Sequence, residues 1–468
     1  MTGWVGWVVA SVFLGATAYA VPVDEPTPAK LRERVATLLA AGDVPGALGA
    51  ATQLVARGAG DDPDDLLLLA RTSYYEALRR IGEGEAGGGI TDALWFDATD
   101  AASRAANLPS GRVSGGTFLG FVLVQRGKFD EAIDALDKVL TEDAAAADAL
   151  ALRGFARSCL GQVDPALVDL DAALARLPDR FEIKVHRARA IAQRSLADGA
   201  KELEALASDP GVDDAFAGDV AAILEPRPDL ALAVLRKVTE RHATPSSVIV
   251  LARMLIQAGD PAAATAVLNE AITEQPDNGS LRAWRAEAAR RANVFDRGYV
   301  DDLCYAARAD CDEATWAHSL LNLSVGVFVE RNDWESARRM CEVLVGLEER
   351  SRVSLANLAL TLRNLGRVDE GGALYRELLE RWPEDASGWN DYGLLLSGTG
   401  RAKDAAEAFS TAAELGNIDA TENLGMLRLA AGHTDAARKN FLDVLRRDPS
   451  RVRSGAALMR LSLPEGGG

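Results

Sequence analysis

The fold of this chain is indicated by the segment at residues 119–139, which reads LGFVLVQRGKFDEAIDALDKV. Thirty-four residues later, the segment at 153–173 reads RGFARSCLGQVDPALVDLDAA. Both carry a small residue in second place, a glycine in ninth, an alanine in fourteenth and a large apolar residue in eighteenth: Gly120 and Gly154, Gly127 and Gly161, Ala132 and Ala166, Leu136 and Leu170. A fixed interval of this length predicts a continuous repeat architecture, in which each unit contacts only its neighbours.

The same register recurs along most of the chain. Further copies lie at residues 251–276, 358–383, 389–412 and 424–449. Residues 31–51 fit one copy, residues 63–109 fit a copy with a long insertion, and residues 181–244 fit poorly. We therefore predict about twelve repeats over residues 28–451, strongest at 113–180, 245–278 and 352–451, followed by a capping helix and a flexible tail at 452–468.

The pattern resembles the tetratricopeptide repeat family, a helix-turn-helix unit with the signature W-x2-L-G-x2-Y, then A, then F, then P. The copy at 389–412 matches it most fully, with Trp389, Gly393, Ala405 and Phe409. The resemblance implies that small residues let helices A and B of a pair approach closely, that the large residue fills the space between them, and that the central glycine ends helix A in a left-handed turn. It implies an all-α solenoid, a right-handed superhelix of antiparallel helix pairs.

Composition and charge narrow the classes of function. The 468 residues are 48% apolar but only 6% aromatic, so Ala and Leu supply the apolar content and favour helices over a β-sandwich or barrel. The formal net charge of −18 would repel the phosphates of nucleic acid, which we therefore exclude as a partner. The 43 Arg against 8 Lys, with abundant Ala and Gly, are typical of GC-rich codons and indicate a bacterial source.

The N-terminal residues differ from the rest of the chain. Residues 3–20 carry no charge and close with Ala18-Tyr19-Ala20, the pattern of a cleavage site. As an uncleaved helix, this run of about 18 residues would reach about 27 Å, which is enough to cross a bilayer core. We predict a signal peptide or an N-terminal membrane anchor at residues 1–20 and a linker at 21–27, hence an exported, periplasmic or membrane-anchored protein.

No motif typical of an enzyme, a cofactor site or a metal site occurs. The glycine-rich stretch at 82–89 lacks a Gly-Lys-Ser/Thr ending and carries two glutamates that would repel phosphate, so it predicts a flexible loop. The aspartates at 61–65 predict a helix start, where the helix dipole favours negative charge. The four histidines have no partner at metal or triad spacing. We expect no catalytic residue, no cofactor and no metal ligand.

The four cysteines, Cys159, Cys304, Cys311 and Cys341, form no C-x-x-C motif. An exported chain permits disulfides, and Cys304 with Cys311 is the closest pair in sequence. Within one helix, however, their Cα atoms would be about 10 Å apart, beyond the reach of a disulfide. We predict reduced cysteines that pack in the structure.

The family resemblance places ligand contacts on the concave face, at positions 2, 5, 9, 12 and 13 of each repeat. In this register the candidates are Phe121, Phe155, Arg189, Arg253, Arg290, Asn322, Arg363 and Asn390. Arg and Asn side chains can hold carboxylates and backbone of a peptide, and an exposed Phe can accept an apolar anchor. The alternative is that these arginines are solvated or paired with neighbouring glutamates. The Lys and Asn set with which chaperone-binding members hold two carboxylates is not found at matching positions.

We expect a scaffold that binds a protein or peptide partner, with an acidic segment favoured by the groove arginines, in the assembly of an envelope or secretion complex. Two alternatives remain open. One is a structural or regulatory module that acts by self-association, and the other is a non-catalytic accessory subunit of an enzyme.

Overall fold

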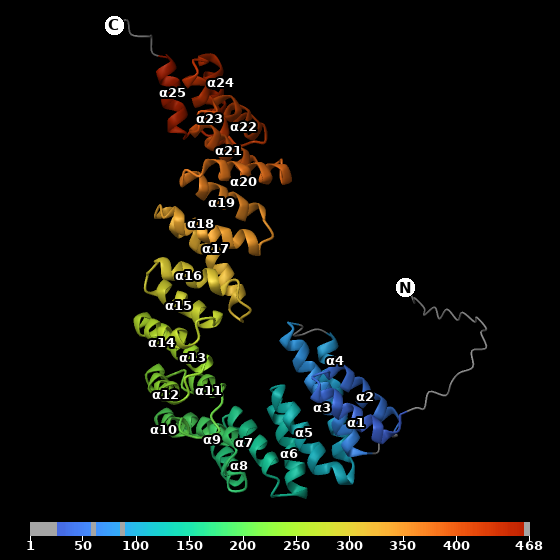
Figure 1. Ribbon diagram of the computed structural model, residues 1–468. Coiled ribbons are helices and arrows are strands. Elements are labelled where there is room, and N and C mark those ends of the chain that lie inside the picture. Colours follow the sequence, from blue (N-terminus) through green and yellow to red (C-terminus); the bar gives the residue numbers. More distant parts are fainter. Residues whose placement is uncertain (1–25, 58–61, 85–88, 463–468) are drawn as a thin grey trace, which may run out of the picture. The chain divides into compact units, whose positions relative to one another are not determined.

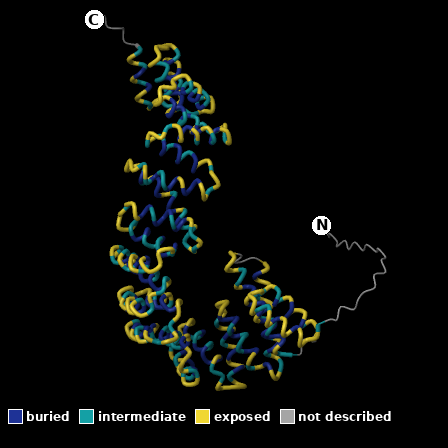
Figure 2. Tube along the Cα trace, viewed as in Figure 1, coloured by how far each residue is buried: buried dark blue, intermediate teal, exposed yellow. Residues whose placement is uncertain are grey.

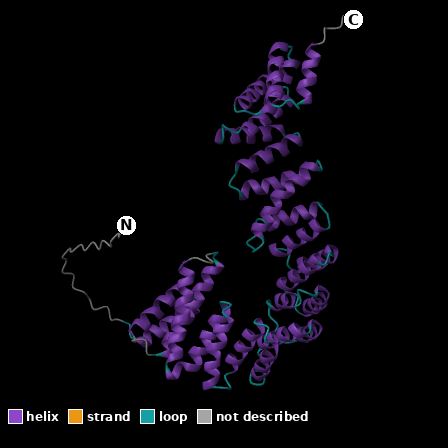
Figure 3. Cartoon of the chain, turned by 180° about the vertical axis from the view of Figure 1, so that it is seen from behind, coloured by secondary structure: helices purple, strands orange, loops and turns teal. Residues whose placement is uncertain are grey.

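The computed structural model describes residues 26–57, 62–84 and 89–462, and all regular elements in these ranges are helices, with no strand among them (Figure 3). The all-α prediction is therefore confirmed for the described residues. The chain divides into two compact units, one up to Val212 and one from Asp213 (Figure 1). The predicted signal peptide or anchor at 1–20, most of the linker at 21–27 and the tail after Ser462 lie outside the described residues.

Unit 1 contains ten α-helices and one short 3-10 helix among its described residues: α1 (Pro28–Ala40), α2 (Val44–Arg57), α3 (Pro63–Gly82), α4 (Gly89–Asn107), η1 (Pro109–Gly111), α5 (Arg112–Gln125), α6 (Phe129–Glu142), α7 (Ala147–Cys159), α8 (Val163–Leu174), α9 (Phe181–Arg194) and α10 (Leu196–Leu206). Each α-helix packs against the next. The first helices of successive pairs also touch one another, α3 with α5, α5 with α7 and α7 with α9.

Unit 2 continues the same arrangement among its described residues: α11 (Phe216–Ile223), α12 (Pro228–Arg241), α13 (Pro245–Gln257), α14 (Pro261–Glu274), α15 (Gly279–Arg291), α16 (Arg297–Ala306), α17 (Ala314–Glu330), α18 (Trp334–Leu347), α19 (Arg352–Asn364), α20 (Val368–Arg381), α21 (Ala386–Gly398), α22 (Ala402–Glu414), α23 (Ile418–Ala430), α24 (Thr434–Arg447) and α25 (Val452–Ser462). The last described helix, α25, packs on α24. None of the described helices is both long enough and apolar enough to span a bilayer.

The turn inside most pairs depends on a residue with positive φ. Seven glycines adopt φ between 70° and 82° at this turn: Gly42, Gly127, Gly161, Gly259, Gly366, Gly400 and Gly432. Two pairs use an asparagine instead, since Asn293 and Asn332 both have φ of 57°. Gly and Asn tolerate this left-handed conformation better than other residues. The predicted left-handed turn at the central glycine is thereby confirmed.

The two helices of a pair meet where a small residue faces a large one. A Cβ added at Gly120 would lie 2.6 Å from Leu136, and one added at Gly393 would lie 2.6 Å from the Phe409 ring. The large side chains at this position are at most 2% exposed: Leu136, Leu170, Tyr375, Phe409 and Phe441. Cys341 occupies the same position and is fully buried. In both units, buried stretches of the helices alternate with exposed ones (Figure 2).

Two stretches that fit the pattern poorly still form helix pairs. The insertion at 63–109 lengthens both helices of its pair, so that α3 has 20 residues and α4 has 19. The predicted helix start is confirmed, because the Asp62 side chain accepts a hydrogen bond from the Asp64 amide and caps α3. In the stretch at 181–244 the irregular element is α11, which has only eight residues. All four cysteines are free; Cys304 and Cys341 are buried as predicted, whereas Cys159 is exposed.

The close contact at Gly393 gives a test of the packing. Gly393→Ala should lower the free energy of unfolding by about 1–3 kcal/mol, because the new methyl group would overlap Phe409. Gly398→Ala is the matched control in the same helix, since no atom lies within 4 Å of its Cβ position. That control should be neutral or stabilising by up to about 1 kcal/mol. Urea unfolding followed by circular dichroism measures both; equal effects would contradict this account of the interhelical contact.

Candidate functional site

An open hollow of about 740 Å³ lies in unit 1 along four successive first helices, α3, α5, α7 and α9. We call it the unit 1 groove. Its lining includes Arg71 from α3, Ser114, Thr117, Phe118, Phe121 and Gln125 from α5, Leu152 and Phe155 from α7, and Ile183 and His186 from α9. Asp148, Arg180 and Glu182 lie at the starts of α7 and α9, and Asp143 lies at the end of α6, before α7. The groove exists because the first helices lie side by side, each one presenting the same face.

Aromatic rings form the wall of the groove. The Phe121 ring lies 5.2 Å from Tyr74 and 5.7 Å from Phe118, measured between centroids. Across the groove, Phe155 lies 4.3 Å from the imidazole of His186. Phe121 and Phe155 were both predicted to contact a ligand, and the structure brings them to one hollow, each half-buried. A half-buried phenylalanine in an open hollow can gain further apolar burial when a ligand binds.

His186 is held in its neutral form. Burial, helped by the nearby positive charge of Arg189, lowers the pKa of this histidine to about 4. Its Nδ1 atom is buried and has no hydrogen-bond partner among the described residues. The groove therefore has an uncharged imidazole as part of its aromatic wall at neutral pH.

The charges of the groove are divided between its ends. At the α3 end, the Arg71 guanidinium lies 5.8 Å from the Phe118 centroid and has no carboxylate within 4.0 Å among the described residues. At the other end, Arg180 lies 3.7 Å from the Asp148 carboxylate and 3.5 Å from that of Glu182. The Asp143 carboxylate accepts a hydrogen bond from the Ala145 amide. One end is thus positive and the other carries more carboxylates than cations.

In unit 2, two of the predicted contact residues are occupied by internal partners. Arg290 donates two hydrogen bonds of 2.7 Å to the buried carboxylate of Glu287, which Arg291 also contacts. Asn322 donates a 2.9 Å hydrogen bond to Glu348. For Arg290, the structure therefore agrees with the alternative given above, that the arginine is paired with a neighbouring glutamate.

Of the remaining predicted residues of unit 2, Arg253 is open to a ligand, whereas Asn390 is buried, with 8% of its surface exposed. Arg253 is exposed and lies 5.4 Å from the centroid of Trp284, without a carboxylate within 4.0 Å among the described residues. Arg363 is half-buried, and its Nη1 atom has no hydrogen-bond partner in the described part of the chain. Asn390 accepts a 3.0 Å hydrogen bond from Asn423. These three residues lie on α13, α19 and α21.

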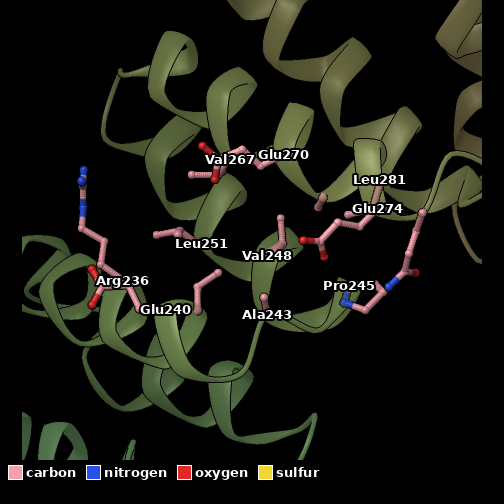
Figure 4. A pocket seen from close by; sticks show the side chains of 13 residues that line it. Arg236, Glu240, Ala243, Pro245, Val248, Leu251, Val267, Glu270, Glu274 and Leu281 are labelled. Atoms are coloured by element: carbon pink, nitrogen blue, oxygen red, sulfur yellow. The ribbon is translucent and has the colours of Figure 1, made fainter.

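A second hollow, of about 280 Å³, lies in unit 2 (Figure 4). Apolar side chains from α13, Val248 and Leu251, face carboxylates from the second helices, Glu240 of α12 and Glu270 and Glu274 of α14. It carries no aromatic ring. No group of three or more His, Cys, Asp or Glu side chains among the described residues is arranged to hold a metal ion.

Sequence reasoning missed several groove residues. Phe118 and Arg71 were not selected, because Phe118 falls outside the five contact positions and Arg71 lies in the irregular copy at 63–109. His186 belongs to the stretch that fits the repeat poorly. In unit 2, the ring pair of Trp284 and Trp316, with centroids 5.4 Å apart and planes tilted by 30°, was also missed. The usable signal for Phe118 was its spacing of three residues from Phe121, which places both on one helical face.

Comparisons with known proteins concern the repeats. The tetratricopeptide repeat family matches residues 227–279 and 357–419, both within unit 2. Among solved structures, the crystal structure of the APC/C hetero-tetramer Cut9–Hcn1 is similar to this chain, with 13% identity and a TM-score of 0.33, over 93% of this chain and 96% of that chain. No curated protein matches. The matched repeats and the described helix pairs identify the fold as an all-α solenoid of tetratricopeptide type.

The lowered pKa of His186 predicts how stability depends on pH. Because the unfolded chain binds a proton near pH 6.5 and the folded chain does not until about pH 4, stability should fall as the pH decreases through this window. Between pH 7.5 and 5.0 the loss should be about 2 kcal/mol, on the scale of 1.36 kcal/mol for each pH unit.

His186→Gln should abolish this part of the pH dependence, as measured by urea unfolding at the two pH values. His433→Gln is the control, since it removes an exposed histidine outside the groove. An unchanged pH dependence in His186→Gln would contradict the buried, neutral imidazole.

Proposed function

We propose that this solenoid is a protein-binding scaffold whose unit 1 groove holds a segment of a partner protein. The observation that carries the proposal is the set of half-buried phenylalanines on neighbouring first helices, Phe118, Phe121 and Phe155, around one open hollow. Apolar hollows with a few polar groups at their edges are the common form of a binding site. The tetratricopeptide-type repeats support the same function, and no metal-binding cluster among the described residues points to chemistry instead.

The groove suits a segment of chain better than a small molecule. The groove runs across four helices, so a bound segment would contact side chains of each helix in succession. One large apolar side chain could insert between the phenylalanines while the rest of the segment lies along the polar rim. An aromatic or aliphatic anchor in such a pocket supplies most of the binding energy. The polar groups at the rim fix which residue of the bound segment lies at which position of the groove.

We also propose a place for this binding. The uncharged run at residues 3–20 supports export or membrane anchoring, and with it a role in assembling an envelope or secretion complex. Fractionation of native cells and amino-terminal sequencing test the location. In unit 2, an acidic partner segment would find Arg253 and Arg363, whereas Arg290 is already paired with Glu287.

Self-association is a second candidate, favoured by the exposed apolar residues of the lengthened α3–α4 pair. Ile90 and Phe96 are 61% and 66% exposed, and Leu78 and Ile81 are also exposed. A surface of this kind commonly marks a contact between proteins. Sedimentation of the wild type and of Phe96→Ser distinguishes this candidate: a dimer that dissociates in the variant would support it.

The groove function predicts the outcome of a co-purification. Phe121→Ser and Phe155→Ser should each weaken capture of a partner by at least about tenfold, because each removes an aromatic contact in the groove. Phe96→Ser is the matched control, since this exposed phenylalanine lies outside the groove.

Quantitative mass spectrometry of proteins captured from the native source measures the effect, with thermal melting to show that the variants remain folded. Equal capture by wild type and both groove variants would contradict the proposal. Loss of capture in Phe96→Ser alone would assign binding to the α3–α4 pair.

A further inference from the structure

The inference drawn here rests on the proposed function and concerns the partner's chemistry. We infer that the unit 1 groove binds an extended segment that carries an acidic residue, a large apolar residue and a basic residue in line. The acidic residue lies beside Arg71 on α3, the apolar residue between Phe121 and Phe155, and the basic residue beside the carboxylates at the α7–α9 end. The groove thereby selects a partner by charge order as well as by an apolar anchor.

The positive end of the groove has a single cation. Arg71 is exposed, lies over the Phe118 ring at 5.8 Å and has no carboxylate within 4.0 Å in the part of the chain that the structure describes. Most arginines of unit 1 differ in this respect; Arg153 and Arg157, for example, both contact the buried Asp169 carboxylate. A guanidinium held on an aromatic face beside a hollow can still donate hydrogen bonds to a carboxylate of a ligand.

The opposite end carries an excess of negative charge. Three carboxylates line it, Asp143, Asp148 and Glu182, beside one lining cation, Arg180, which contacts Asp148 and Glu182. Three minus one leaves a formal charge of −2 among these residues. Asp148 and Glu182 are 62% and 64% exposed, so a basic side chain of a ligand can reach either. His186 does not offset this charge, because its lowered pKa of about 4 keeps it neutral at pH 7.

The middle of the groove offers hydrogen bonds that the protein itself does not use. The side chains of Ser114, Thr117 and Gln125 line the groove and make no hydrogen bond to another described residue. Other helical threonines of unit 1, such as Thr72 and Thr99, donate to a backbone carbonyl one turn earlier. Unused hydroxyl and amide groups beside an apolar pocket suit the backbone of an extended segment.

The spacing of the helices sets the length of the segment. Packed helices lie about 8–10 Å apart, so the distance from α3 to the α7–α9 end is about 20–30 Å. An extended chain covers about 3.3 Å with each residue, and a segment of about nine residues therefore spans the groove. The apolar anchor belongs near its centre, over α5 and α7.

Three synthetic nine-residue peptides test the inference by fluorescence anisotropy with the full chain. All have a central phenylalanine and serine spacers, and their end residues are Glu and Lys, Lys and Lys, or Glu and Glu. The wild type should bind the Glu–Lys peptide about threefold to fivefold more tightly than either of the others, as expected for partly exposed ion pairs. The preference should shrink at 0.5 M salt.

Charge reversal at one end should change the preference in a stated direction. Arg71→Glu should favour the Lys–Lys peptide over the Glu–Lys peptide, because both ends of the groove are then negative. Arg34→Glu is the matched control: it makes the same change in net charge at an exposed position of α1, outside the groove, and should keep the wild-type preference.

Two results would overturn the inference: equal binding of all three peptides by the wild type, or a preference that Arg71→Glu leaves unchanged. Absence of binding by every peptide would also overturn it, while the co-purification with Phe121→Ser and Phe155→Ser decides the proposed function separately. A melting curve for each variant shows that the chain is folded in the comparison.

Discussion

The close approach of the two helices in each pair is the constraint on which the rest of the structure depends. A small residue on the first helix, such as Gly120 or Gly393, lies against a large side chain on the second, Leu136 or Phe409. Because the first helix contributes no side chain at this contact, one large side chain of the second helix fills the space, and the pair becomes a thin layer that the next pair can cover. The first helices of successive pairs then touch, as α5 does α7, and their outer faces form one surface.

The surface formed by the first helices differs between the two units, each taken by itself. In unit 2, Arg290 donates hydrogen bonds to Glu287, and Asn322 donates one to Glu348. Part of the predicted binding surface therefore stabilises the stack itself. In unit 1, Phe121, Phe155 and Arg71 face an open hollow, and Arg71 has no carboxylate near it in the described chain. Side chains without an internal partner are the ones from which a ligand can gain energy. Arg253 and Arg363 of unit 2 share this property but lie apart, on α13 and α19, whereas those of unit 1 line one hollow, and this favours unit 1 as the binding surface.

The repeat register was sufficient to predict the all-α fold, the turns at Gly127 and Gly161, and the place of Phe121 and Phe155 on one face. Each of these follows from a local rule: a left-handed turn favours glycine, and a contact position recurs with the repeat. The hydrogen-bond and ion-pair partners of the predicted contact residues could not be assigned in the same way, because they depend on which side chains lie next to one another in the folded chain. The contribution of His186 to the groove depends on burial by neighbouring pairs, which no local pattern encodes.

Site-specific photo-crosslinking tests most directly the claim that the unit 1 groove is the binding surface. A photoreactive amino acid is placed at Thr117, which lines the groove on α5, or at Asp134, an exposed position on the neighbouring helix α6. The account predicts a crosslinked partner from the Thr117 position and none from Asp134 in the native source. Crosslinks from Asp134 without any from Thr117 would contradict it and place the partner on the opposite face of the helix pair.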